Sequence, residues 1–257
     1  MNKNKIFITS LFFFVSFCFS ALLSAAPLCP LVPHTAEYRV FYGDKSIDLG
    51  KARFQLQLNG DRFLYQFDSA LSLLALSDKR HVTSEFSVSK HHIFPIRYFH
   101  DRTGFGSDYQ EQIVYLKQQG NIISRYKGDT KKYPYAPNLF DSMSLLMQLR
   151  LDLMYGKGEL KYKLLKGKKI DDYQFKVLNQ NTIKLASNSY NTVKLEVVRK
   201  SKKRQTYIWL APELGYLPIK VSHYKKGDKQ LEIQLINQSF LNSTVHHDKT
   251  NSTLPPS

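Results

Sequence analysis

Alternation of apolar and polar residues with a period of two recurs along this chain and limits the fold to one built mainly from β-strands. Phe54, Leu56 and Leu58 alternate with arginine and glutamine, so the apolar side chains share one face of an extended segment. Residues 59–61, Asn-Gly-Asp, then supply a hairpin turn. Further alternation occurs in residues 63–67, 173–177, 193–197 and 231–235. These patterns predict an antiparallel sheet with one face against a core.

One segment departs from this pattern and has helical spacing. Within residues 140–155, leucines share one side of a helix at positions 145, 146, 149 and 153. Asp141 can cap the first turn, and Gly156 and Gly158 are typical of a helix end. Because the leucine stripe must be buried, we expect one amphipathic helix to cover or plug an opening of the sheet. The expected fold is mainly β: a curved antiparallel sheet, or an incomplete β-barrel or sandwich, with this one helix.

The amino terminus has the pattern of a secretory signal peptide. Two lysines precede an apolar run at residues 6–23, and small residues follow it, with a cleavage site near Ala25 or Ala26. A membrane anchor is the alternative, because the run approaches the roughly 20 residues that span a bilayer. The small residues and the prolines after them favour cleavage. Since Cys18 and Cys29 each follow a bulky residue, neither resembles a lipidation site, and we expect an exported, periplasmic protein that is not a lipoprotein.

The chain is long enough for one domain after cleavage. Removing 25 residues leaves about 230, which is within the range of a single β-sandwich or barrel. The last residues lack apolar periodicity and are typical of a disordered segment. We expect a signal peptide at residues 1–25, a leader at 26–36, a single β-rich domain at 37–240 and a disordered tail at 241–257.

A strong positive charge limits the partners of the chain. It has 37 basic and 21 acidic residues, and without Lys3 and Lys5 the net charge is +14. This charge must face outward, because basic side chains are rarely buried without a partner. In a cytosolic protein it would indicate nucleic acid, but in the envelope the polyanions are phospholipid headgroups, lipopolysaccharide and wall polymers. Solubility without a partner is the alternative.

Basic residues concentrate in short segments between the predicted strands. The candidate binding residues are Lys166, Lys168, Lys169, Arg199, Lys200, Lys202, Lys203 and Arg204. One interpretation is a charged hairpin end that discourages edge-to-edge association of sheets. The other is a loop that docks on anions, where each basic residue near an anionic membrane adds about 1 kcal/mol.

The sequence has no motif of a metal, cofactor or catalytic site. His91 and His92 would point to opposite faces of a strand, and no zinc-ligand spacing accompanies them. A GxSxG elbow, a Walker loop and a dinucleotide-binding glycine motif are all missing. Scattered carboxylates could supply acid and base groups, at Glu85, Asp101, Asp108 and Glu111. We expect no metal, no cofactor and no enzyme activity.

Short segments of the chain resemble a known family. They are residues 38–40, 49–52 and 140–150, and residues 209–218 with the sequence Trp-Leu-Ala-Pro-Glu-Leu-Gly-Tyr-Leu-Pro. They are similar to the exported family of Gram-negative bacteria catalogued as domain of unknown function 3108. The resemblance implies a periplasmic or outer-membrane-associated β-rich protein without an established activity. We interpret Asp141 as the helix cap and Arg150 as a partner for a carboxylate elsewhere, with simple helix punctuation as the alternative for both.

Three hypotheses for function follow. The leading one is a non-enzymatic envelope protein that binds or carries a lipid or another amphipathic anion, because export, aromatic strands and positive charge occur together. The second is an interaction module that docks on outer-membrane proteins or wall polymer through basic loops. The third is a hydrolase. Candidate partners are an envelope lipid, lipopolysaccharide or an outer-membrane protein, with peripheral membrane contact and without nucleic acid.

Overall fold

The computed structural model describes residues 31–201 and 203–241. The first half of this region forms β1 (His34–Tyr42), β2 (Ile47–Asn59), β3 (Arg62–Leu73), β4 (Leu76–Ser89), β5 (His92–Gly104), β6 (Tyr109–Leu116), the 3₁₀ turn η1 (Lys117–Gln119), β7 (Asn121–Tyr126) and β8 (Asp129–Pro134). The second half forms β9 (Leu139–Phe140), α1 (Ser142–Met154), β10 (Leu160–Lys166), β11 (Lys169–Leu185), β12 (Asn188–Val198), β13 (Arg204–Ala211), the 3₁₀ turn η2 (Pro212–Leu214), β14 (Leu217–Lys225) and β15 (Asp228–Phe240).

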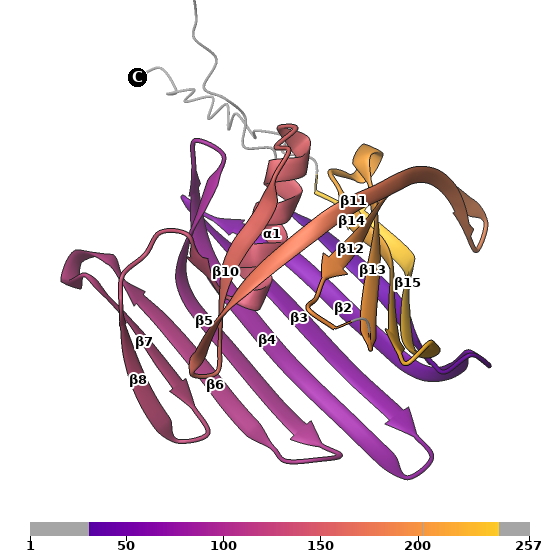
Figure 1. Ribbon diagram of the computed structural model, residues 1–257, viewed down its shortest axis with the longest axis horizontal. Helices are drawn as coiled ribbons and strands as arrows, with labels where there is room; N and C mark the ends of the chain where they lie inside the picture. Colours follow the sequence, from indigo (N-terminus) through magenta and orange to yellow (C-terminus); the bar gives the residue numbers. More distant parts are fainter. Residues whose placement is uncertain (1–30, 202, 242–257) are drawn as a thin grey trace, which may run out of the picture.

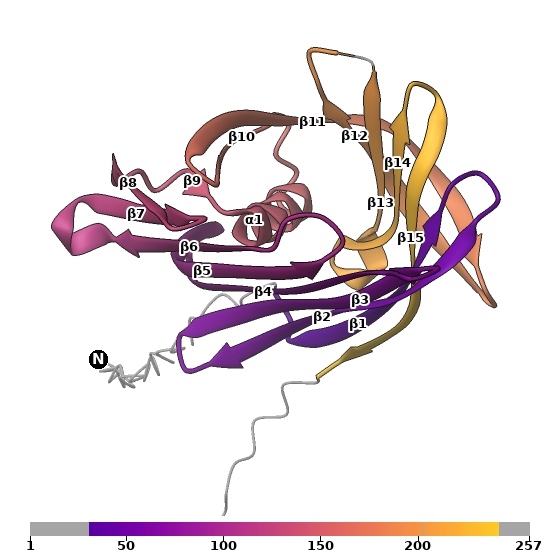
Figure 2. The same ribbon diagram turned by 90° about the horizontal axis from the view of Figure 1, so that it is seen from below.

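All fifteen strands of the described region belong to one sheet. Their order is β8-β7-β6-β5-β4-β3-β2-β1-β15-β14-β13-β12-β11-β10-β9, and only the β9–β10 pair is parallel. The sheet curls around α1: β1–β8 form a broad floor, β13–β15 rise from one side of it, and β10 and β11 pass over the helix (Figures 1 and 2). The edge strands β8 and β9 do not pair with each other, so the sheet stays open. The prediction of a mainly β, curved antiparallel sheet or incomplete barrel is confirmed.

The β2–β3 hairpin forms where the alternating pattern predicts it. Asn59 pairs with Arg62 across a two-residue turn, and Gly60 has a φ of 62°, which glycine adopts at little cost. On β3, Phe63 and Tyr65 are buried in the core. The inward face of this strand is therefore the apolar face of the sequence pattern.

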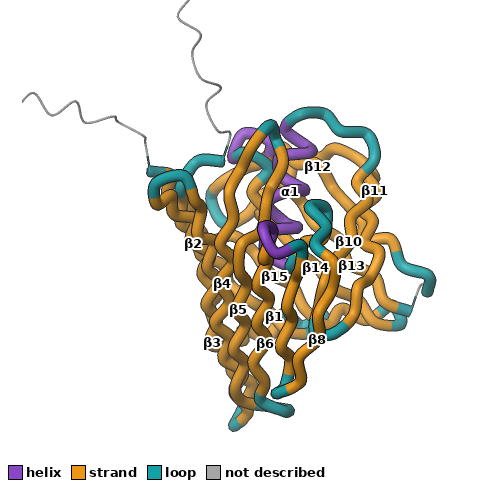
Figure 3. Tube along the Cα trace, turned by 90° about the vertical axis from the view of Figure 1, so that its left-hand side faces the viewer, coloured by secondary structure: helices purple, strands orange, loops and turns teal. Residues whose placement is uncertain are grey.

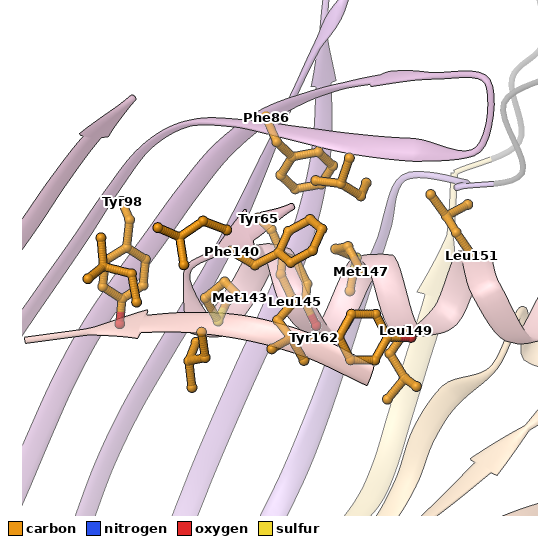
Figure 4. Packing of buried hydrophobic residues seen from close by; sticks show 14 of the residues in the cluster. Tyr65, Phe86, Tyr98, Phe140, Met143, Leu145, Met147, Leu149, Leu151 and Tyr162 are labelled. Atoms are coloured by element: carbon orange, nitrogen blue, oxygen red, sulfur yellow. The ribbon is translucent and has the colours of Figure 1, made fainter. Parts of the chain in front are cut away.

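Helix α1 fills the interior of the curled sheet. It extends from Ser142 to Met154, within the predicted 140–155, and Figure 3 shows it between two groups of strands. Strands contact it from below and above, so nine of its residues are buried rather than one leucine stripe. Met147, Leu149 and Leu151 belong to the same buried cluster as Phe86 and Tyr162, and Figure 4 labels all five. Within the described residues, no helix has the length and apolar character needed to cross a bilayer.

The two edges of the sheet, near β8 and near β9, approach each other. Hydrogen bonds and an ion pair that involve side chains join them instead of strand pairing. The backbone N–H of Gly167, in the β10–β11 turn, donates to Glu111 Oε1 on β6 at 2.5 Å. The carbonyl of Gly167 accepts from Ser124 Oγ on β7 at 2.5 Å. Lys168 pairs with Asp129 across the same seam at 2.5 Å. These three contacts therefore hold the two edges of the curled sheet together without strand pairing.

The first strand begins before residue 37, the predicted start of the domain. Strand β1 starts at His34, inside the predicted leader, and Leu31 is buried in the core. The predicted signal peptide and all but the first residue of the predicted tail lie outside the described residues.

Candidate anion-binding surface

Two of the basic segments lie at the same end of the sheet. Strands β10, β11, β12 and β13 are mutually antiparallel neighbours, so the β10–β11 and β12–β13 turns are adjacent. The first turn contains Lys166, Lys168 and Lys169, and the second contains Arg199, Lys200, Lys203 and Arg204. Lys202, also predicted as a site residue, lies outside the described residues. The sheet therefore brings together the two basic segments that the sequence singles out.

The β12–β13 turn is fixed by its own backbone contacts. Ser201 Oγ accepts from the N–H of Lys203 at 3.3 Å. The carbonyl of Lys203 accepts from the N–H of Lys226 in the β14–β15 turn at 2.8 Å. This second contact connects the turn to a further basic hairpin end, at Lys225 and Lys226. The turn is therefore a supported part of the sheet end.

A groove of about 740 Å³ lies between the start of β11 and the β12–β13 turn. Its apolar residues are Ile170, Tyr173, Val197 and Val198, and its basic residues are Arg199, Lys200, Lys203 and Arg204. Asp171 and Asp172 also line it. The volume is within the range of ligand sites, and an apolar floor with basic walls suits a molecule with an apolar part and an anionic part.

The basic side chains of the groove outnumber its two carboxylates, Asp171 and Asp172. Arg199, Lys200, Lys203 and Arg204 are exposed, and within the described residues none of them forms an ion pair. Their field reaches the neighbouring strand β14. Burial, and then the charges of Arg199 and Arg204, hold the pKa of His223 below its ordinary value. The groove therefore has an electrostatic potential that favours an anion.

A second cavity, of about 310 Å³, differs in this respect. It lies beside α1 and β10, and three of its lining residues are lysines. Lys157 pairs with Asp152 at 2.9 Å, and Lys163 pairs with Asp172 at 3.0 Å. Lys161 pairs with Glu159. Because each ammonium group already has a carboxylate partner, this cavity offers less free positive charge.

Of the predicted site residues that the structure describes, four gather in the groove. Lys168 instead pairs with Asp129, and its position is part of the seam. Lys166 and Lys169 are exposed at the end of the β10–β11 hairpin, beside the groove. The apolar floor was not predicted as part of the site, although the alternation of residues 173–177 and 193–197 already places Tyr173 and Val197 on strand faces.

Buried polar groups also meet inside the sheet, around Arg150. Its Nε donates to the carbonyl of Gly215 at 2.9 Å, and its Nη1 lies 3.4 Å from His34 Nε2. Burial, and then the charge of Arg150, lower the pKa of His34 to about 4. Burial raises the pKa of Tyr38 and Tyr65. The prediction of a carboxylate partner for Arg150 is wrong, because a backbone carbonyl takes that place.

Asp141 caps the helix as predicted. Its carboxylate accepts from the N–H groups of Met143 and Ser144 at 2.9 Å each, and from the hydroxyl of Ser144 at 2.7 Å. Ser84 Oγ of β4 donates to it at 3.0 Å. Burial raises the pKa of Asp141, and these hydrogen bonds oppose that effect. The cap therefore connects the helix to the floor of the sheet.

Three of the four scattered carboxylates have structural partners, and the side chain of Asp101 has no hydrogen bond or ion pair within the described residues. Glu85 pairs with Arg62 and Arg97, and Asp108 accepts from the N–H of Gly104 at 2.9 Å. Glu111 accepts from Gly167, and burial raises its pKa. Each of these three groups is engaged in holding a turn or a neighbouring strand.

Comparison with known proteins adds a family and a fold. None of the curated proteins is a significant match. Among solved structures, the chain resembles one described as a β-barrel-like protein of domain of unknown function DUF1849 from Brucella abortus, with a TM-score of 0.58 and 9% sequence identity over 83% of this chain and 99% of that chain. That likeness concerns the fold alone. The model of the family described as protein of unknown function (DUF3108) matches residues 37–234, and this chain belongs to that family.

Proposed function

We propose that this protein is an exported, non-enzymatic binding protein of the bacterial envelope that holds an anionic amphipath in the groove between β11 and the β12–β13 turn. The single observation that carries the proposal is a groove of about 740 Å³ with an apolar floor and four exposed basic side chains, none of which forms an ion pair within the described residues. Export is supported by the amino-terminal pattern alone.

The packed interior supports binding at the surface over carriage inside the sheet. Buried side chains of α1 fill the space that a carried lipid would need, and Met147, Leu149 and Leu151 have no exposed surface. Five cavities of the described region are all open to solvent. A ligand would therefore contact the groove while part of it stays accessible.

The apolar floor also favours an amphipath over a purely polar wall polymer. Ile170 and Val198 are more than 40% exposed. An acyl chain can cover these side chains and so release water from apolar surface. A polysaccharide covers them less well. Docking on a wall polymer through charge alone is therefore the second candidate, and its binding would depend on salt and not on chain length.

Isothermal titration calorimetry can test the proposal. The ligand is monomeric dihexanoyl phosphatidylglycerol, and dihexanoyl phosphatidylcholine is the control with the same chains and no net charge. Combined Arg199→Glu and Arg204→Glu should weaken binding of the anionic lipid about 10- to 100-fold, since each basic residue contributes about 1 kcal/mol. Combined Lys90→Glu and Lys117→Glu, which make the same charge change at the opposite end of the sheet, should leave affinity unchanged.

Two calorimetric outcomes would contradict the proposal. Equal affinity for the two lipids, or equal loss of binding in both double variants, would show that the groove is not the site. An unchanged affinity when the acyl chains are removed, as in glycerophosphoglycerol, would favour a polar polyanion as the ligand.

A further inference from the structure

Two neighbouring hairpin ends expose large apolar side chains. Leu74, at the β3–β4 turn, is 97% exposed, and Phe105, in the β5–β6 loop, is 63% exposed. Leu76 beside them is 44% exposed. Single exposed apolar residues are common on protein surfaces, but a cluster at the end of long hairpins indicates an interaction site.

The structure fixes these two ends relative to each other. The N–H of Phe105 donates to the carbonyl of Ser77 at 2.5 Å. Arg102 donates through Nη2 to Asp78 Oδ2 at 2.5 Å and to the carbonyl of Phe105 at 2.6 Å. These contacts hold the loop in place while the Phe105 ring stays in solvent. The β5–β6 loop is therefore already ordered in the folded protein, so binding costs little further conformational entropy.

Basic residues surround the exposed apolar cluster. Lys79 is exposed on β4, three residues after Leu76, and Arg80 follows it. Lys127, in the β7–β8 turn, donates to Ser107 Oγ in the β5–β6 loop at 3.3 Å. The acidic groups here are already engaged: Asp78 binds Arg80 and Arg102, and Asp108 accepts from Gly104. Apolar ends with basic neighbours match the layered chemistry of an anionic membrane surface.

The cluster lies at the same end of the sheet as the basic groove. Because every strand from β1 to β8 is antiparallel to its neighbour, the turns β1–β2, β3–β4, β5–β6 and β7–β8 share one end. The pairing of β1 with β15 continues that end to the β14–β15, β12–β13 and β10–β11 turns. In Figure 1 these hairpins point toward the lower part of the picture. Tyr42 and Ile47, at the β1–β2 turn, add further exposed apolar surface there.

We infer that this end of the sheet binds the surface of an anionic phospholipid bilayer, with Leu74 and Phe105 inserted among the headgroups and the basic residues around them on the lipid phosphates. The inference goes beyond the proposed function, because these hairpin ends do not line the groove. The occupant is a bilayer and not a single amphipath, since the apolar groups protrude and so need a partner that they can enter.

Flotation with vesicles of mixed phosphatidylglycerol and phosphatidylcholine tests this inference. Combined Leu74→Ser and Phe105→Ser should lower the partition coefficient at least about tenfold, since insertion of each apolar side chain contributes on that scale. Leu58→Ser is the control. Leu58 is 48% exposed, and it lies at the end of β2 that is far from the β1–β2 turn. All three substituted side chains are exposed, and a thermal melt checks that each variant is folded.

A second measurement reports insertion directly. In the Phe105→Trp variant, indole fluorescence should shift to shorter wavelength when anionic vesicles are added, beyond any shift in the wild-type protein, which has one tryptophan. Vesicles of phosphatidylcholine alone should give no such shift.

The inference and the proposed function can fail separately. The Leu74 and Phe105 variant should keep the calorimetric affinity for dihexanoyl phosphatidylglycerol that the groove variant loses. Flotation of that variant equal to wild type would overturn the inference. Loss of a dimer in ultracentrifugation, with no vesicle binding by the wild-type protein, would overturn it in favour of a second copy of this chain as the partner.

Discussion

Arg150 and Gly215 are joined by a hydrogen bond of 2.9 Å that runs from the centre of α1 to the turn before β14. Both residues lie in segments through which the chain resembles its family, residues 140–150 and 209–218. The two segments are distant in sequence and meet in the interior. Their contact fixes the helix against the part of the sheet that rises beside it.

Replacement of Arg150 by alanine should therefore destabilise the protein. The substitution leaves the Gly215 carbonyl unpaired and opens a void, so we expect the free energy of unfolding to fall by about 3 kcal/mol. Urea denaturation followed by circular dichroism measures this change. Arg125→Ala, at an exposed position on β7, should change it by less than about 0.5 kcal/mol. Equal midpoints for the two variants would contradict the role of Arg150.

The cap at Asp141 gives a second prediction. Asp141→Ala removes the acceptor for two backbone N–H groups and two hydroxyls, and should cost about 2 kcal/mol or more. Asp141→Asn should cost less, because its amide oxygen still accepts from the backbone. If the alanine and asparagine variants unfold at the same urea concentration, the cap contributes less than we infer.

The acidity of His34 predicts a pH dependence of stability. Its pKa in the folded protein is lowered from 6.5 to about 4, by burial and then by Arg150. Between these values the unfolded chain binds a proton that the folded protein does not, so stability falls as the pH decreases from about 6.5 to about 4. Burial, together with the charges of Arg80 and Lys166, lowers the pKa of His100 to about 4 and adds to the same trend.

Urea midpoints measured across this pH range test the assignment. His34→Gln keeps an acceptor for Arg150 and should reduce the slope, leaving the parts due to His100 and His223, whose pKa values are also lowered. Gln118→Ala, at an exposed position without a titratable group, should keep the wild-type slope. A His34→Gln slope equal to wild type would show that this ring does not titrate as described.

Close packing of two hairpins predicts different effects at two glycines. Gly104 has a φ of 120°, and a Cβ there would collide with the carbonyl of Ser77. Gly128 has a φ of 87° with nothing within 4 Å of its Cβ position. Gly104→Ala should therefore cost about 3 kcal/mol or more, and Gly128→Ala about 1 kcal/mol. Calorimetric melting of both variants checks the difference, and equal melting temperatures would refute it.

The local parts of this fold follow from the sequence. Alternation at Phe54, Leu56 and Leu58 predicts β2, and the spacing around Asp141 predicts both the helix and its cap. These features depend on neighbours within a few residues, so backbone periodicity and capping chemistry suffice to predict them.

The long-range parts could not be predicted in the same way. Arg150 binds a backbone carbonyl 65 residues away, and every residue type has a carbonyl, so no sequence pattern identifies this acceptor. Lys168 resembles the other basic residues in sequence, but the curl of the sheet brings Asp129 to it. The groove likewise depends on the twist of β11 and on the position of the β12–β13 turn, which the basic cluster alone does not specify.

The most direct test of the groove as a binding site is nuclear magnetic resonance of the labelled protein during titration with dihexanoyl phosphatidylglycerol. The proposal predicts that amide shift changes concentrate at residues 170–173, 197–201, 203 and 204 and decrease with added salt, while those of α1 stay unchanged. Shift changes centred on Met147, Leu149 and Leu151, with none in the groove, would contradict it and indicate carriage in the interior.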